Sequence, residues 1–139
     1  MTNDPPMTKG NQRPPPLVIG GSLVIGHWRL ALFVVLLTLW TWRLCSPISP
    51  ELRAGMNAIG QPMLLAKTAH VVGYAVLAAL AVGLPRPRLL VGLLALHGAA
   101  TEWIQTYVPG RTGQATDVLI DCAGITLGVL AVRLWKRRP

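Results

Sequence analysis

The amino-acid sequence predicts an all-α integral membrane protein, a four-helix bundle with the N- and C-termini in the cytoplasm. The first observation is composition: 52% of the 139 residues are hydrophobic and only 13% are charged. The second is the arrangement of the apolar residues in long runs between turns and basic residues, which is typical of membrane helices and not of soluble domains. The third is a set of polar residues inside these runs, where polar groups are costly and usually have a function.

Four apolar stretches are long enough to cross a bilayer, which requires about 20 residues per helix. We expect the spans at about 28–45, 64–84, 89–107 and 117–134. Proline-containing turns end the first three. Residues 51–62 form a polar connection with room for a short interfacial helix, and Thr116 is placed to cap the last span.

The N-terminal part of the chain differs from the rest. Residues 1–16 contain five prolines and no apolar run, which predicts a disordered cytoplasmic tail. Residues 17–139 are then one transmembrane domain, without a cleavable signal peptide. Two cysteines, Cys45 and Cys122, set no disulfide framework and are interpreted as buried thiols; whether they pair stays open.

The net charge of +8 has a topological explanation. In a soluble protein it would suggest nucleic acid, but here basic residues flank apolar runs and are not interleaved with stacking aromatics, so no nucleic-acid partner is predicted. With both termini in the cytoplasm, nine of the 13 Lys and Arg residues lie inside and four outside. Aromatic residues mark two interfaces, with Trp28 and Trp135 at the inner one and Trp40, Trp42, Trp103 and Tyr107 at the outer one.

Small residues predict where the helices pack closely. Gly124 and Gly128 make a GxxxG step in the last span. Gly98, with neighbouring alanines, gives the third span a smooth face, and alanines do the same in the second span. Such contacts are common in membrane bundles and carry no function of their own.

The polar residues of the last three spans reach similar depths below the outer surface. Glu102 and His70 are the proposed catalytic pair, because a buried carboxylate must be paired or protonated and a histidine exchanges protons near neutral pH. The proposed substrate-binding residues are Lys67, Arg111, Gln105, Asp117, Asp121 and Tyr74. No metal and no cofactor is predicted, because zinc-binding HExxH, nucleophile-elbow GxSxG and glycine-rich phosphate motifs are absent.

Several of these residues also have a structural interpretation. Lys67 can extend to the outer interface, and Asp117 can be a carboxylate that the helix dipole stabilises. Arg111 can be a solvated loop residue. His97, alone within the third span, is interpreted as a hydrogen-bonded packing residue.

Three blocks of sequence resemble the VanZ-like family, small four-helix bacterial membrane proteins named for a teicoplanin-resistance determinant. The blocks are Lys67 to His70 with Tyr74, Glu102 to Gln105, and Pro109 to Arg111 continuing through Asp117 to Gly128. The chain departs from the family pattern at Ala66, where an acidic residue is usual, and at Asp121, where asparagine is usual. The resemblance implies a protein of the bacterial cytoplasmic membrane with a cell-envelope role, in a family linked to glycopeptide antibiotic resistance; whether this member affects antibiotic susceptibility stays open.

The sequence therefore supports two functions. The first is a protein that binds or modifies a lipid-linked or cell-wall component at the outer leaflet through the buried polar cluster. The alternative is a non-catalytic membrane scaffold or partner subunit whose polar layer locks helix packing. Membrane lipids are the expected partners, an oligomer is compatible with the sequence, and turnover stays open. A small transporter is disfavoured because four spans without a broken helix offer little machinery for alternating access.

Overall fold

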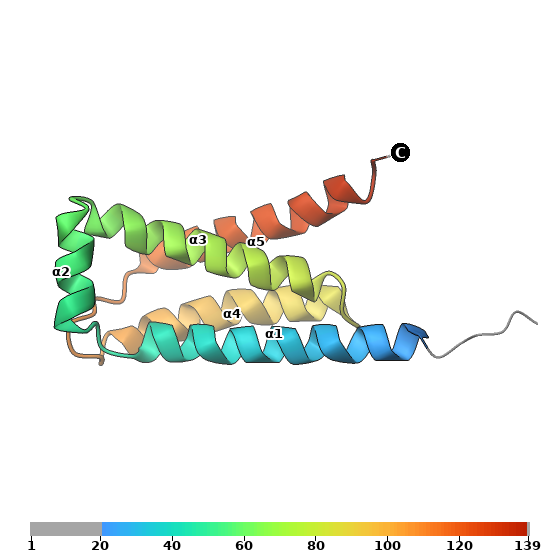
Figure 1. Ribbon diagram of the computed structural model, residues 1–139, viewed down its shortest axis with the longest axis horizontal. Helices are drawn as coiled ribbons and strands as arrows, with labels where there is room; N and C mark the ends of the chain where they lie inside the picture. Colours follow the sequence, from blue (N-terminus) through green and yellow to red (C-terminus); the bar gives the residue numbers. More distant parts are fainter. Residues whose placement is uncertain (1–20, 139) are drawn as a thin grey trace, which may run out of the picture.

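The computed structural model describes residues 21–138, which form five α-helices and no strand. The helices are α1 (Gly21–Cys45), α2 (Pro50–Ala58), α3 (Pro62–Ala81), α4 (Pro87–Gln105) and α5 (Ala115–Trp135). The four long helices run roughly along the longest axis of the molecule, and the short α2 lies across one end of them (Figure 1). The all-α prediction is confirmed, whereas the predicted tail at 1–16 lies outside the described residues.

Three helices contain segments that are long and apolar enough to cross a membrane: His27–Cys45, Pro62–Ala81 and Ala115–Trp135. The third predicted span, 89–107, corresponds to α4, which has 19 residues but does not reach the same hydropathy. Its apolar run is interrupted by polar residues such as His97 and Glu102. Large apolar side chains such as Leu39, Leu96 and Leu119 are exposed on the outer faces of the helices, as expected of a surface that contacts lipid.

The start of α5 differs from the prediction, whereas the short helix allowed for in the connection before α3 is present. Helix α5 begins at Ala115, so Thr116 lies within its first turn and bonds the side chain of Gln114 at 3.3 Å; its predicted role as the cap is wrong. The connection at 51–62 contains the helix α2. The Ser49 hydroxyl accepts from the main-chain N–H of Leu52 at 3.2 Å and Pro50 takes the first position, which are strong signals for a helix start.

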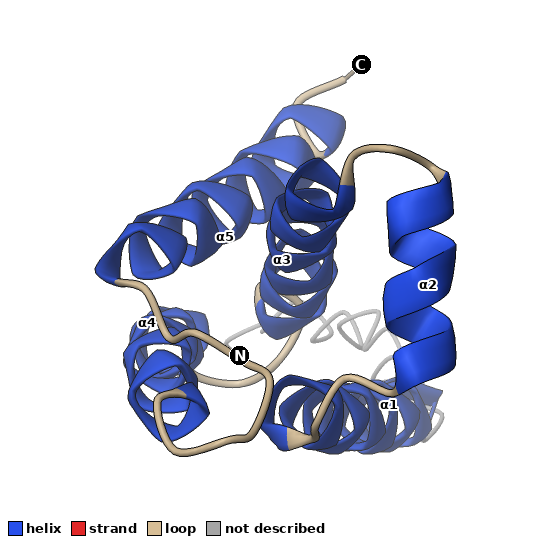
Figure 2. Ribbon diagram, turned by 90° about the vertical axis from the view of Figure 1, so that its left-hand side faces the viewer, coloured by secondary structure: helices blue, strands red, loops and turns tan. Residues whose placement is uncertain are grey.

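Helix α3 lies among the other four helices and contacts each of them (Figure 2). Its closest partner is α5. A Cβ atom at Gly124 would meet the backbone of Val71, and one at Gly128 would meet the backbone of Ala75. The GxxxG step therefore forms a tight seam with α3, and it fixes how deep the side chains of both helices lie.

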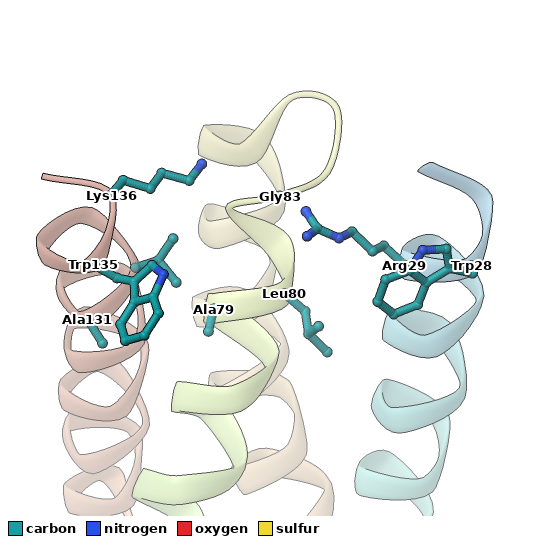
Figure 3. A pocket seen from close by; sticks show the side chains of 9 residues that line it. Trp28, Arg29, Ala79, Leu80, Gly83, Ala131, Trp135 and Lys136 are labelled. Atoms are coloured by element: carbon teal, nitrogen blue, oxygen red, sulfur yellow. The ribbon is translucent and has the colours of Figure 1, made fainter. Parts of the chain in front are cut away.

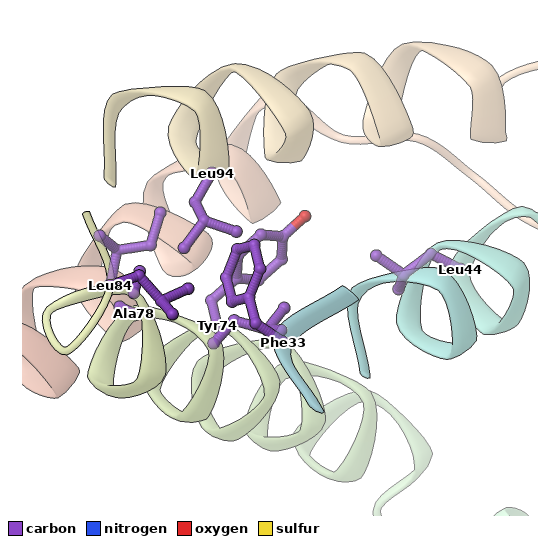
Figure 4. Close-up of a cluster of buried hydrophobic side chains, with 9 residues drawn as sticks. Phe33, Leu44, Tyr74, Ala78, Leu84 and Leu94 are labelled. Carbon is purple, nitrogen blue, oxygen red and sulfur yellow. The ribbon is translucent and has the colours of Figure 1, made fainter. Parts of the chain in front are cut away.

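The apolar core lies in the middle of the bundle. Phe33 from α1, Tyr74 from α3 and Leu94 from α4 point toward one another (Figure 4), and Ile125 from α5 is buried with them. Cys45 and Cys122 are unpaired. In the turn before α4, Arg86 has a φ angle of 56°, a left-handed conformation that favours glycine.

Candidate functional site

Three buried ionisable side chains from three helices meet in the half of the bundle next to α2. They are His70 of α3, Glu102 of α4 and Asp121 of α5, with exposed fractions of 7%, 4% and 0%. The Nδ1 atom of His70 lies 2.8 Å from Asp121 Oδ1 and 3.8 Å from Glu102 Oε1. These residues are called the triad below. The prediction that Glu102, His70 and Asp121 reach one depth agrees with this arrangement.

Asp121 orients the imidazole ring of His70. Because an ionised carboxylate only accepts hydrogen bonds, Nδ1 of His70 is the donor in the 2.8 Å contact. In the neutral ring this leaves Nε2 as the nitrogen that can accept a proton. Nε2 forms no hydrogen bond with the described residues, whereas a carboxylate fixes the opposite nitrogen, as in acid–base pairs of enzymes.

Glu102 has both carboxylate oxygens engaged. Oε1 accepts from the side-chain amide of Gln105 at 3.2 Å, and Oε2 accepts from the main-chain N–H of Gln114 at 2.9 Å. Gln114 immediately precedes α5, so the carboxylate satisfies a donor at the positive end of the helix dipole. The loop can approach because Gly113 has no side chain: a Cβ there would overlap the main-chain carbonyl of Glu102. Glu102 thus joins α4 to the start of α5.

Asp121 is less completely bonded. Its Oδ2 atom is buried and has no hydrogen-bond partner among the described residues, and the same holds for Oδ1 of Asp117. Gly98 of α4 makes room for the carboxylate, because a Cβ at Gly98 would lie 2.8 Å from Asp121 Oδ2. The smooth face predicted at Gly98 therefore has a specific purpose, since it admits Asp121 between α3 and α4.

A second hydrogen-bond chain runs deeper in the bundle. The Tyr74 hydroxyl lies 3.0 Å from Nδ1 of His97, whose Nε2 lies 2.8 Å from the Thr41 hydroxyl. Thr41 gives its only proton to the carbonyl of Leu37, so His97 donates to Thr41 and accepts from Tyr74. His97 is hydrogen-bonded, as its interpretation as a packing residue requires. Tyr74 is fully buried, and its hydroxyl also lies 3.4 Å from Thr101, so it has no surface for a ligand.

Two open clefts meet at His70. The polar cleft, of about 310 Å³, is lined mainly by residues of α3 and the α4–α5 loop, and its polar lining includes Lys67, His70, Gln105, Arg111 and Asp117. The apolar cleft, of about 240 Å³, lies between α1, α2 and α3 and is lined by residues such as Trp40, Leu44, Leu52 and Leu65. Five residues line both clefts: His70 and Arg111, together with the apolar Ile48, Met56 and Ala66. The site therefore has a polar side and an apolar side that share one histidine and one arginine.

The two predicted cations of the site differ in their surroundings. Arg111 donates from Nε to the carbonyl of Ser46 at 2.8 Å and from Nη2 to the carbonyl of Arg43 at 2.6 Å, which ties the loop to the end of α1. Burial and the neighbouring Arg43 guanidinium lower the pKa of Arg111 from its usual value. Lys67 is half-buried and forms no hydrogen bond or ion pair with the described residues. Its ammonium group is thus available to a ligand in the polar cleft.

Sequence reasoning missed the role of Trp40. Beyond the predicted place at the outer interface, this side chain is half-buried, with its ring edge-on to His70 and Tyr74 at centroid distances of 6.1 and 6.2 Å. Its ring lies against Gly73, where a Cβ would overlap it. The only sequence signal was a glycine in the second span, and a glycine alone does not identify its partner.

The triad is also the place where the described chain could hold a metal ion. One ligand atom from each of His70, Glu102 and Asp121 lies within 4.8 Å of the others. A nitrogen with two carboxylates suits several divalent cations. To bind one, His70 would give up its hydrogen bond to Asp121, and Glu102 would move toward the ring.

A family model described as VanZ/LLP1 matches residues 23–136, a range that includes the triad and the residues of both clefts. No curated protein and no solved structure shows a significant match to the chain.

Proposed function

The chain belongs to the VanZ/LLP1 family, and from this premise we propose that it binds a lipid-linked component of the cell envelope at the polar and apolar clefts. In this proposal all four long helices cross the bacterial cytoplasmic membrane, both termini lie in the cytoplasm, and the clefts open toward the outer leaflet. The anionic headgroup occupies the polar cleft beside Lys67, and hydrocarbon occupies the apolar cleft beside Trp40.

One observation carries the proposal: a polar and an apolar cleft meet at His70 and Arg111. A ligand that is polar at one end and apolar at the other fits such a pair of clefts, because its headgroup then contacts polar groups and its hydrocarbon contacts apolar ones. Lys67 has no hydrogen-bond or ion-pair partner among the described residues and supplies positive charge to the headgroup. Arg111 keeps Nη1 for the same purpose, because its other two guanidinium nitrogens donate to the carbonyls of Ser46 and Arg43.

The chemistry assigned to the site is proton exchange by His70. Nε2 takes a proton from the bound headgroup or returns one to it, and Asp121 stabilises the imidazolium that forms. Asp121 is then a positioning residue, because it acts through the ring. Glu102 also acts as a positioning residue in this proposal, since both of its oxygens already bond the chain.

The test compares lipid-linked wall precursors and envelope lipids by mass spectrometry in cells that carry the wild-type protein, His70→Asn or an empty vector. Asparagine can keep a hydrogen bond to Asp121 but cannot take a proton. We expect a species that is changed by the wild type and unchanged by His70→Asn. Lys67→Gln should reduce the amount of that species that copurifies with the protein. The teicoplanin susceptibility of the same strains tests the link to glycopeptide resistance.

His97→Gln is the matched control, because His97 is a half-buried histidine outside both clefts. It should lower stability but leave the lipid profile as in the wild type. Identical profiles in all strains, with each protein inserted at normal levels and no lipid that copurifies with the wild type and is lost from Lys67→Gln, would reject the proposal.

That result would favour the alternative function, a non-catalytic scaffold or partner subunit whose polar layer locks helix packing. The observation behind this alternative is that Glu102 joins α4 to the start of α5. Under it, Glu102→Gln lowers the thermal midpoint without any change in envelope lipids.

A further inference from the structure

Charge is divided along the long axis of the protein. The described carboxylates, Glu51, Glu102, Asp117 and Asp121, all belong to the half next to α2. The opposite end is formed by the start of α1, the α3–α4 turn and the end of α5, and its cations are Arg29, Arg86, Arg88, Arg133, Lys136, Arg137 and Arg138. This basic end therefore has no described carboxylate to neutralise it.

A cleft of about 610 Å³ opens at the basic end. Figure 3 shows α3 between α5, which carries Trp135 and Lys136, and α1, which carries Trp28 and Arg29. The floor is apolar and made largely of small residues: Ala79, Leu80, Gly83, Ala131 and Val132. The cleft exists because α5 diverges from the other helices toward its C-terminus (Figure 1). It is called the basic-end cleft below.

We infer that the basic-end cleft binds one anionic phospholipid of the adjacent leaflet. The phosphate lies between the side chains of Arg29 and Lys136, and an acyl chain follows the apolar floor along α3. Neither cation has a carboxylate partner among the described residues; Arg29 lies over the Trp28 ring at 5.7 Å. Two tryptophans at the mouth match the level of lipid headgroups, and basic pockets between membrane helices are typical sites for anionic lipids.

Charge complementarity favours this occupant over two others. The N-terminal residues 1–20 carry Lys9 and Arg13 against Asp4, so they would add positive charge to the cleft. A second copy of the chain would bring two sets of basic residues together. A phosphodiester supplies the missing negative charge, and its hydrocarbon covers the apolar floor.

The alternative to a built site is general attraction, because basic residues at this end also serve membrane topology. The experiment must therefore separate the cleft from the charge. The full-length protein is reconstituted in nanodiscs of phosphatidylcholine with phosphatidylglycerol, released into mild detergent, and its retained lipids are counted by native mass spectrometry. We expect the wild type to retain one phosphatidylglycerol in preference to phosphatidylcholine.

Two variants remove the site in different ways. Arg29→Gln combined with Lys136→Gln removes both phosphate ligands and should lower retention at least tenfold. Ala131→Phe fills the floor without a change in charge and should lower it to a similar extent. These three side chains are exposed, so the variants should fold, which an unchanged thermal midpoint checks.

The matched control is Arg86→Gln combined with Arg88→Gln, which removes the same charge from the same end but outside the cleft. This control should retain the lipid. An equal loss in the control, wild-type retention by Ala131→Phe, or no retained phosphatidylglycerol in the wild type would each overturn the inference. His70→Asn should leave retention unchanged, because the triad lies in the opposite half, so this inference and the proposed function fail separately.

Discussion

The two ends of the protein both place charge in a membrane bundle, but they do so in opposite ways. In the half next to α2, the charges of the triad are buried, come from three helices and bond one another or the main chain. At the basic end, the cations are exposed and have no described carboxylate nearby. Buried charge requires partners in fixed positions, whereas exposed charge can use water or lipid. The comparison indicates that the helices must pack in fixed positions around the triad, whereas the basic end does not require this.

The α3–α5 seam shows how this difference is built. Gly124 and Gly128 bring α5 against Val71 and Ala75. Val71 follows His70 in the chain, and Ala75 lies about one turn farther along α3. The small residues continue toward the basic end with Ala79 and Ala131, but there the two residues line an open cleft. Close contact thus ends where the buried polar residues end.

The largest expected effect comes from breaking the seam. Gly128→Leu would drive a side chain into the backbone of Ala75 and separate α3 from α5. Because overpacking against backbone is not relieved by a change of rotamer, we expect a loss of about 3 kcal/mol in the free energy of unfolding. Thermal unfolding in detergent, followed by circular dichroism, measures it. Gly92→Leu is the control, because no described atom outside its own stretch of helix lies within 4 Å of a Cβ at that site. Equal thermal midpoints for the two variants would show that the seam is not tight.

The second effect concerns Asp121. Asp121→Ala leaves Nδ1 of His70 buried without a hydrogen-bond partner. Removal of one member of a buried charged pair lowers the free energy of unfolding by about 3 kcal/mol, and we expect a smaller loss here because the histidine can stay neutral. Asp121→Asn keeps an acceptor for Nδ1 and should cost about 1 kcal/mol. Chemical denaturation in detergent provides both values. If alanine and asparagine destabilise equally, the hydrogen bond from His70 does not orient the ring.

Much of the fold could be predicted from sequence, because apolar runs and proline-containing turns act locally. They located the four long helices, although Ala115, and not Asp117, begins α5. The start involves a distant group, since Glu102 accepts from the main-chain N–H of Gln114, and the side chain of Gln114 itself makes no capping hydrogen bond. Helix α4 was predicted as a span, but its hydropathy is lower than expected because it carries polar residues of the site.

The site could be predicted in composition but not in connectivity. Helical periodicity places Lys67, His70 and Tyr74 on one face, yet the structure puts them in three different surroundings: an open cleft, the triad and a closed hydrogen-bond chain. The packing of Trp40 was not foreseen because an aromatic at the end of a span usually marks the interface. Its contact with Gly73 depends on the crossing of α1 and α3, which periodicity does not determine.

That contact gives the third prediction. Gly73→Ala would displace the Trp40 ring, which lies edge-on to both His70 and Tyr74. The ring can partly yield, so we expect a loss of about 1 kcal/mol, at the low end for overpacking. Near-ultraviolet circular dichroism should change with it, because the aromatic contacts are altered. An unchanged spectrum with a normal thermal midpoint would mean that Trp40 packs independently of Gly73.

At the basic end, one substitution to glycine should stabilise the protein, unlike the destabilising substitutions above. Arg86 has a φ angle of 56°, and a left-handed conformation costs a residue with a side chain about 1 kcal/mol. Arg86→Gly should therefore raise the thermal midpoint, partly offset by greater freedom of the unfolded chain. Arg88→Gly is the matched control, because it removes the same charge from within α4 and should lower the midpoint. A lower midpoint for Arg86→Gly would show that the turn is not strained at this residue.

The smallest expected effect is the pH dependence that the exposed carboxylate of Glu51 gives to α2, in contrast to the buried carboxylates. Hydrogen bonds from its own main-chain N–H and from Ser49 lower the pKa of Glu51 in α2, and the side chain is exposed. A carboxylate with a lowered folded-state pKa stabilises the helix above its unfolded pKa of about 4, and this stabilisation is lost as the pH falls through the folded value. Amide exchange protection in Pro50–Ala58 should therefore decrease slightly between pH 6 and pH 3. Glu51→Gln should remove that part of the decrease. If α2 responds equally in both proteins, the acid sensitivity comes instead from the buried carboxylates that hold the loop beside α2, and the two kinds of charge are coupled through Arg53, which donates to the carbonyl of Gly110.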